Sequence, residues 1–203
     1  MKKYIIIGTL LSILLIVVAL TVILQKRAKG PRIEEGDKEQ QLALYFQNMG
    51  ISLVPSIPIT SEIVLPDLDG NKVRLSDYRG KILFLTFWAT WCPPCREEMP
   101  SMEKLHTWLK GKDFVMMAVD LQEPAPRVKK FFQDHKLTFK ALLDKDGRVA
   151  QMFGIRNIPT TFILDREHRV IGMAVGAREW DSRHSLRMFE YLLDHEGVLA
   201  SSG

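Results

Sequence analysis

The sequence predicts an α/β domain built on a mixed β-sheet with helices on both faces, preceded by an apolar N-terminal segment. From residue 81 onward, apolar runs typical of buried strands alternate with amphipathic segments of helical period. Two strand-like runs separated by a short turn then close the pattern, and a last amphipathic segment follows them. Alternation of this kind joins parallel strands through helices, whereas the closing hairpin adds an antiparallel pair. With 203 residues, the chain has room for one such domain and an appendage.

The appendage is the apolar run of residues 4–24, which contains no charged residue. As a helix, this run would measure about 31 Å, enough to cross a bilayer core of about 30 Å. We expect an uncleaved transmembrane anchor, because the basic segment Gln25–Lys29 that follows offers no good small-x-small cleavage site. Basic residues flank both ends of the run, so the charges alone do not fix its orientation. A stub of residues 1–3 precedes it, and a polar tether follows over residues 25–59, in which residues 41–49 have some helical character.

The domain itself is expected over residues 60–197, with a tail at 198–203. It opens with a β-hairpin, in which residues 63–65 and 72–75 flank a turn at 69–71. The later elements are expected in this order: strand 81–88, helix 93–110, strand 114–120, helix 126–135, strand 138–143, helix 146–153, strand 160–165, strand 169–175 and helix 179–195.

The net charge of +4 does not indicate a nucleic-acid partner. Six of the 28 Lys and Arg residues lie within residues 1–32, which contain no Asp or Glu. Residues 33–203 therefore hold 22 basic and 24 acidic residues, a formal net charge of −2. The basic groups concentrate beside the apolar run, and the predicted domain lacks the clustered basic residues that bind DNA or RNA.

The only two cysteines, Cys92 and Cys95, stand at the junction of a predicted strand and a predicted helix. A disulfide that closes so short a loop stabilises a fold by about 2 kcal/mol, against about 4–5 kcal/mol for a loop of 100 residues. A structural zinc site normally needs four protein ligands, and the chain has no second cysteine pair. A c-type haem site needs a histidine directly after the second cysteine, where this chain has Arg96. The pair therefore indicates a redox-active disulfide.

The place of the pair predicts different roles for the two thiols. Cys92, at the N-terminal end of the helix, would face unpaired backbone N–H groups and the positive end of the helix dipole, which favour the thiolate. We expect Cys92 to be the exposed nucleophile, with a pKa below the ~8.5 of free cysteine. Cys95, one turn further on, is expected to be the shielded resolving thiol. Pro93 and Pro94 suit the first helical turn, because the N–H groups they lack would be unpaired there, and they stiffen the loop.

The segment Gly80–Pro100, GKILFLTFWATWCPPCREEMP, resembles the active-site segment of the TlpA/ResA-type thiol–disulfide oxidoreductases. These are membrane-anchored members of the thioredoxin superfamily. A second match stands about 65 residues on, in Asn157–Asp165, NIPTTFILD, and the resemblance covers roughly residues 60–195. It implies a thioredoxin-like fold, a location in the cytoplasmic membrane, and a domain that faces the periplasm or the cell exterior.

The resemblance also implies roles outside the cysteine pair. Family members often carry a glutamate close to the buried thiol, and Glu98 stands at that position, so we expect it to help deprotonate Cys95. The alternative is a solvent-facing glutamate without a role. The family places a cis bond at Ile158–Pro159, packed against the disulfide, with the backbone of Ile158 open to an incoming extended chain. Trp91 is expected to border the disulfide.

These features predict a thiol–disulfide oxidoreductase that exchanges disulfides with proteins through its Cys-Pro-Pro-Cys site. The resemblance further implies a reductive task, such as keeping the haem-binding cysteines of apocytochrome c reduced, with electrons from a membrane thiol carrier. The sequence shows no metal, nucleotide or flavin site, so we expect the disulfide between Cys92 and Cys95 to be the only redox group.

Three alternatives stay open. A dithiol oxidase that forms disulfides would have the same residues, and only its reduction potential would differ. A thiol peroxidase of the peroxiredoxin kind shares the fold, but it needs a threonine three residues and a proline seven residues before its reactive cysteine. This chain has Ala89 and Leu85 there. A chaperone or scaffold would keep its activity after both cysteines were replaced by serine.

Overall fold

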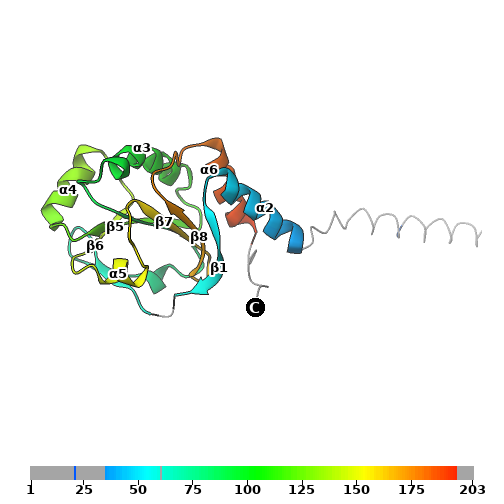
Figure 1. The fold of residues 1–203 in the computed structure, drawn as a ribbon, viewed down its shortest axis with the longest axis horizontal. Helices are drawn as coiled ribbons and strands as arrows, with labels where there is room; N and C mark the ends of the chain where they lie inside the picture. Colours follow the sequence, from blue (N-terminus) through cyan, green and yellow to red (C-terminus); the bar gives the residue numbers. More distant parts are fainter. Residues whose placement is uncertain (1–20, 22–34, 60, 196–203) are drawn as a thin grey trace, which may run out of the picture. The chain divides into compact units, whose positions relative to one another are not determined.

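Six strands form one mixed β-sheet at the centre of the fold: β1 (Ser52–Pro58), β4 (Ile82–Trp88), β5 (Phe114–Leu121), β6 (Lys140–Asp144), β7 (Thr160–Leu164) and β8 (Arg169–Val175). Their order across the sheet is β1-β8-β7-β4-β5-β6 (Figure 1). β4 lies parallel to β5 and antiparallel to β7, and all of its residues are buried. A strand covered on both faces explains the unbroken apolar run in the sequence.

The structure is a computed structural model that describes Thr21, residues 35–59 and residues 61–195. The chain divides into two units, Met1–Asp37 and Lys38–Gly203, and the sheet belongs to the second. The predicted anchor at residues 4–24 lies outside the described residues apart from Thr21, as do the stub and the tail. Within the described ranges, no helix has both the length and the apolar character needed to span a membrane.

Helices cover the two faces of the sheet unequally. One face carries the four longer helices, α2 (Glu35–Asn48), α3 (Pro93–Trp108), α4 (Ala125–Asp134) and α6 (Arg183–Asp194). The other face carries the short helix α5 (Arg148–Met152), the 3₁₀ helix η1 (Leu75–Tyr78) and the hairpin of β2 (Val64–Pro66) with β3 (Lys72–Arg74). Successive residues of β4 supply the two cores alternately: Phe84 packs with the longer helices, and Leu85 with the shorter elements. The predicted mixed sheet with helices on both faces is therefore confirmed.

The N-terminal hairpin also forms as predicted. β2 and β3 pair antiparallel, with Val64 opposite Arg74 and Pro66 opposite Lys72. Gly70 supplies the positive φ of +87° that the turn requires. The later helices and strands lie within a few residues of their predicted bounds, and α6 begins at Arg183, where the Ser182 hydroxyl caps it.

The folded unit begins before residue 60. The predicted boundary between a tether (residues 25–59) and a domain (from residue 60) is therefore wrong. α2 packs on the sheet through Leu42 and Phe46, whose side chains are fully buried, and β1 pairs antiparallel with β8. β1 contains two prolines, which an edge strand tolerates although they lack an N–H group. Gly172 of β8 allows α2 to approach the sheet closely, because a Cβ at this position would lie 2.5 Å from the ring of Phe46.

Candidate functional site

The cysteine pair lies where the strand β4 passes into the helix α3. Cys92 is the N-cap residue of α3, and its Sγ accepts a hydrogen bond of 3.3 Å from the backbone N–H of Cys95. Pro93 and Pro94 occupy the first helical turn as predicted. The two cysteines form a disulfide, with their Cα atoms 5.3 Å apart. The N-terminal end of the helix therefore points one backbone N–H group, that of Cys95, at the sulfur of Cys92.

Both sulfurs are covered in this disulfide state. Cys95 is 0% exposed and Cys92 only 3%, so the expectation of an exposed Cys92 is wrong here. The cover comes from the loop before β7, because the carbonyl oxygen of Ile158 lies 3.7 Å from the Sγ of Cys92. Trp91 directly precedes Cys92 in the sequence. It is 60% exposed, so much of its apolar side chain faces solvent.

The loop over the disulfide is held at both ends. The Ile158–Pro159 peptide bond is cis, as the family resemblance implied. The backbone N–H of Gly176 donates to the carbonyl of Pro159 at 2.8 Å, and the Thr160 hydroxyl donates to the carbonyl of Asn157 at 2.7 Å. The loop is therefore tied to the end of β8 and to the start of β7, which fixes the backbone that faces Cys92.

Glu98 lies on α3 one turn after Cys95, and its side chain is buried, with 2% of the residue exposed. One carboxylate oxygen, Oε2, accepts hydrogen bonds from the indole N–H of Trp180 at 3.0 Å and from the backbone N–H of Arg178 at 3.1 Å. The other oxygen, Oε1, has no partner among the described residues. Burial outweighs these two donors and raises the pKa of Glu98 to about 7. A solvent-facing Glu98 is thereby excluded, while its catalytic role stays a prediction.

Arg178 connects this buried acid to the N-terminal elements. Its Nε donates to the carbonyl of Met49 at 3.1 Å, and one terminal nitrogen donates to that of Gly50 at 3.0 Å. The other terminal nitrogen donates to the carbonyls of Gly176 and Ala177. The guanidinium thus ties the loop after β8 to the corner between α2 and β1. The sequence does not predict these hydrogen bonds of Arg178, because their acceptors are backbone carbonyl oxygens.

A pair of buried acids lies at the end of β5, Asp120 within the strand and Glu123 just after it, and the sequence analysis did not predict it. Glu123 accepts hydrogen bonds from the backbone N–H and the hydroxyl of Thr90, which stands two residues before Cys92. Asp120 accepts the backbone N–H of Glu123 at 3.1 Å, and its other oxygen is buried without a partner among the described residues. Burial and the neighbouring carboxylate raise the pKa of Asp120 to about 8. The pair anchors the turn that leads into the cysteines.

The residues predicted from the sequence gather at one end of the sheet. Cys92, Cys95, Glu98 and the Ile158–Pro159 loop form a single site, since the loop touches one sulfur and the acid lies one helical turn from the other. Among residues 35–59 and 61–195, no cluster of three or more His, Cys, Asp or Glu side chains could hold a metal ion. That the disulfide works without a cofactor stays a prediction.

Comparison with known sequences identifies relatives that are named thiol-disulfide oxidoreductases. Residues 59–173 match the AhpC/TSA family. The thiol-disulfide oxidoreductase ResA of Geobacillus thermodenitrificans (strain NG80-2) is 40% identical over 115 residues, which are 57% of this chain and 66% of that protein. The protein of the same name from Bacillus cereus (strain ATCC 10987 / NRS 248) is 40% identical over 53% of this chain and 62% of its own length. The chain thus spans slightly less than two thirds of these relatives, and the resemblance to ResA-type proteins is confirmed.

Solved structures share the fold. A crystal structure from Chlorobium tepidum, assigned to a thiol:disulfide interchange protein DsbE, has a TM-score of 0.63 and 31% identity, over 70% of this chain and 99% of that one. The thioredoxin domain of a thiol-disulfide oxidoreductase from Bacteroides vulgatus has a TM-score of 0.59 and 26% identity, again over 70% and 99%. These likenesses confirm the predicted thioredoxin-like fold.

Proposed function

The chain belongs to the AhpC/TSA family, and we propose that it is a thiol–disulfide oxidoreductase that acts on protein disulfides through Cys92 and Cys95. The observation that carries the proposal is the disulfide at the N-terminal end of α3, with one sulfur capping the helix and a buried carboxyl group one turn beyond the other. The names of the relatives, thiol-disulfide oxidoreductase and thiol:disulfide interchange protein, support it.

The reductive cycle starts from the dithiol form. The Cys92 thiolate attacks one sulfur of the substrate disulfide, forms a mixed disulfide and expels the other substrate sulfur as a thiolate. The Cys95 thiolate then attacks the Cys92 sulfur, which releases the second substrate thiol and closes the Cys92–Cys95 disulfide. Two electrons pass from the protein to the substrate, and an external dithiol must return them. The helix N-terminus stabilises the anion on Cys92 in the first step.

Glu98 is the residue that we assign to the proton of Cys95. The Cys95 thiol must lose its proton before the second step, and burial leaves no bulk water to take it. A carboxyl group with a pKa near 7 accepts a proton at neutral pH and returns it later, whereas an ordinary carboxylate would be a weaker base. The Glu98→Gln variant should therefore keep the first step and slow the second.

We propose the direction of electron transfer and the cellular location of the domain from the family resemblance. We assign a reductive role, with electrons from a membrane thiol carrier and with apocytochrome c cysteines as one substrate class. The domain would work outside the cytoplasmic membrane, attached by residues 4–24. An oxidase would use the same two sulfurs, so the reduction potential measured against glutathione or dithiothreitol separates the two directions. A potential in the range of strong oxidants, near −120 mV, would contradict the reductive role.

The test of the function is to trap the intermediate. Cys95→Ala in the full chain removes the resolving thiol, so partners should accumulate as mixed disulfides on Cys92 that dithiothreitol releases. The matched control is Cys92→Ala, which should trap nothing. Equal trapping by both variants, or none by either, would contradict the mechanism. Turnover of hydrogen peroxide by the wild-type chain would instead support the thiol peroxidase, which the residues Ala89 and Leu85 disfavour.

A further inference from the structure

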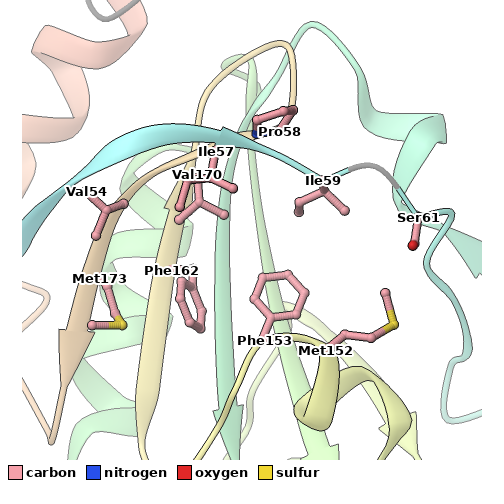
Figure 2. Close-up of a pocket in the computed structure, with 10 residues that line it drawn as sticks. All are labelled: Val54, Ile57, Pro58, Ile59, Ser61, Met152, Phe153, Phe162, Val170 and Met173. Carbon is pink, nitrogen blue, oxygen red and sulfur yellow. The ribbon is translucent and has the colours of Figure 1, made fainter. Parts of the chain in front are cut away.

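A pocket of about 430 Å³ opens on the thinly covered face of the sheet, beside the short helix α5. Figure 2 shows side chains from three directions around it: Ile57 from β1, Met152 and Phe153 from the end of α5, and Phe162 and Met173 from β7 and β8. No charged side chain lines it. Its volume falls within the range of about 300–1,000 Å³ that is typical of ligand sites.

The pocket adjoins a smaller one that reaches the loop over the disulfide. This smaller pocket, of about 180 Å³, shares Phe153, Phe162 and Met173 with the first. Its remaining lining includes Asn157 and Thr160, the residues on either side of the Ile158–Pro159 bond. The two pockets therefore form one groove along β7 and β8, which begins beside the residues that flank the Ile158–Pro159 bond; among the described residues, Arg156 is the one charged residue in its lining.

Exposed apolar side chains follow this groove. Seven large apolar side chains are exposed in the described part of the chain, and three of them line the two pockets: Val175 in the smaller one, and Ile57 and Met152 in the larger one. Exposed apolar side chains that gather around adjoining pockets are typical of a binding surface.

We propose that this groove holds an extended segment of the substrate protein, with large apolar side chains three to five residues from the reactive cysteine. The proposal rests on the proposed function, which brings a substrate cysteine to Cys92. The spacing follows from β7, because Phe162 and Leu164 stand three and five residues after Pro159, and Leu164 is paired with Val170 of the larger pocket. At about 3.3 Å per residue, these positions are roughly 10–17 Å along the strand.

A covalently attached substrate is the occupant that the site itself favours. Once a mixed disulfide has formed, the residues next to the substrate cysteine are held at the mouth of the groove, so even a weak apolar interaction acts at high effective concentration. The larger pocket has no charged residue in its described lining, which disfavours nucleotides and other anions there. A second copy of the chain and a lipid acyl chain are the remaining occupants, and the experiment separates them.

The test uses the reduced full chain in lipid nanodiscs and peptides that carry one cysteine as a thionitrobenzoate mixed disulfide. One peptide has leucine and phenylalanine three and five residues after the cysteine, one has them before it, and one has serine at all these positions. We expect one apolar peptide to react about ten-fold faster than the serine peptide, since burial of one large side chain is worth about that factor.

Lysine at the rim should abolish this advantage. Ile57→Lys and Met152→Lys place a charge at side chains that are 55% and 51% exposed, so folding should survive; Met152→Gln is a milder second variant. The matched controls are Leu44→Lys and Trp108→Lys, at side chains of similar exposure (53% and 46%) outside the groove, which should keep the ten-fold preference. All variants should react normally with the small disulfide of Ellman's reagent.

The outcomes separate the inference from the proposed function. Normal reaction with Ellman's reagent but equal rates for apolar and serine peptides would overturn the groove and leave the function intact. Reaction no faster than free cysteine, for every peptide and for Ellman's reagent, would overturn the function itself. Rim variants that change self-association in sedimentation, or nanodisc binding, without changing the peptide preference would assign the pocket to a second copy or to lipid and also overturn the proposal.

Discussion

The burial of Glu98 predicts a stability that falls as the pH rises. Its pKa is about 7 in the folded protein and about 4.5 in the unfolded chain, so the folded state binds more protons between these values. Stability decreases with pH wherever the folded state binds more protons. Ionisation of the buried Glu98 therefore lowers the free energy of unfolding. This loss is absent below pH 4.5, reaches about 2 kcal/mol at pH 6 and levels at about 3 kcal/mol above pH 7.

Glu98→Gln should remove this pH dependence. Glutamine is neutral, and its amide oxygen can still accept the two hydrogen bonds that Oε2 accepts from Trp180 and Arg178. The variant should match the wild type near pH 4.5 and exceed it by about 3 kcal/mol at pH 8. Urea unfolding of the oxidised full chain at several pH values measures the difference.

The neighbouring residue supplies a matched control for this prediction. Glu97 lies on the same helix turn but is exposed. The unfolding free energy of Glu97→Gln should therefore change with pH in the same way as that of the wild type. The reasoning fails if the difference between Glu98→Gln and wild type stays constant from pH 5 to pH 8. It fails equally if the difference has the opposite sign at pH 8.

Three further substitutions test individual contacts. Trp180→Phe removes an N–H donor that lowers the pKa of Glu98, so the stability decrease should begin at the same pH but continue to a higher pH in the same urea series. Gly172→Ala drives a methyl group into the aromatic ring of α2 and should lower the unfolding free energy by about 1–3 kcal/mol, measured by urea at pH 7. Thr90→Val keeps the shape but removes the hydroxyl donor to the buried Glu123 carboxylate, for an expected loss of about 1–3 kcal/mol; a loss below 0.5 kcal/mol would contradict the burial of that acid.

The sequence predicted the sheet and the cysteine site because local pattern and tertiary position agree there. The apolar run of β4 is buried on both faces, and the prolines at the start of α3 stand where a helix accepts them. The position of Pro159 in the cis loop came from the resemblance to a family, since most X-Pro bonds are trans.

The missed features depend on long-range partners. α2 has a weakly amphipathic sequence, and β1 contains Pro55 and Pro58, so neither element shows that it packs on β8. Asp120 and Glu123 stand where β5 ends and a loop begins, a position at which acids are usually solvated. Only the fold shows that this loop lies under Thr90 at the carboxyl end of β4.

The two outer strands of the sheet are both protected against pairing with another chain. A free strand edge invites another chain to pair with it and to aggregate. Here β1, at one edge, lacks two backbone N–H groups at its prolines and has an irregular register between Leu53 and Ile57. At the other edge, Asp67 beside β2 forms a bridge with Leu142 of β6. Neither outer strand therefore offers another chain an uninterrupted row of backbone groups to pair with.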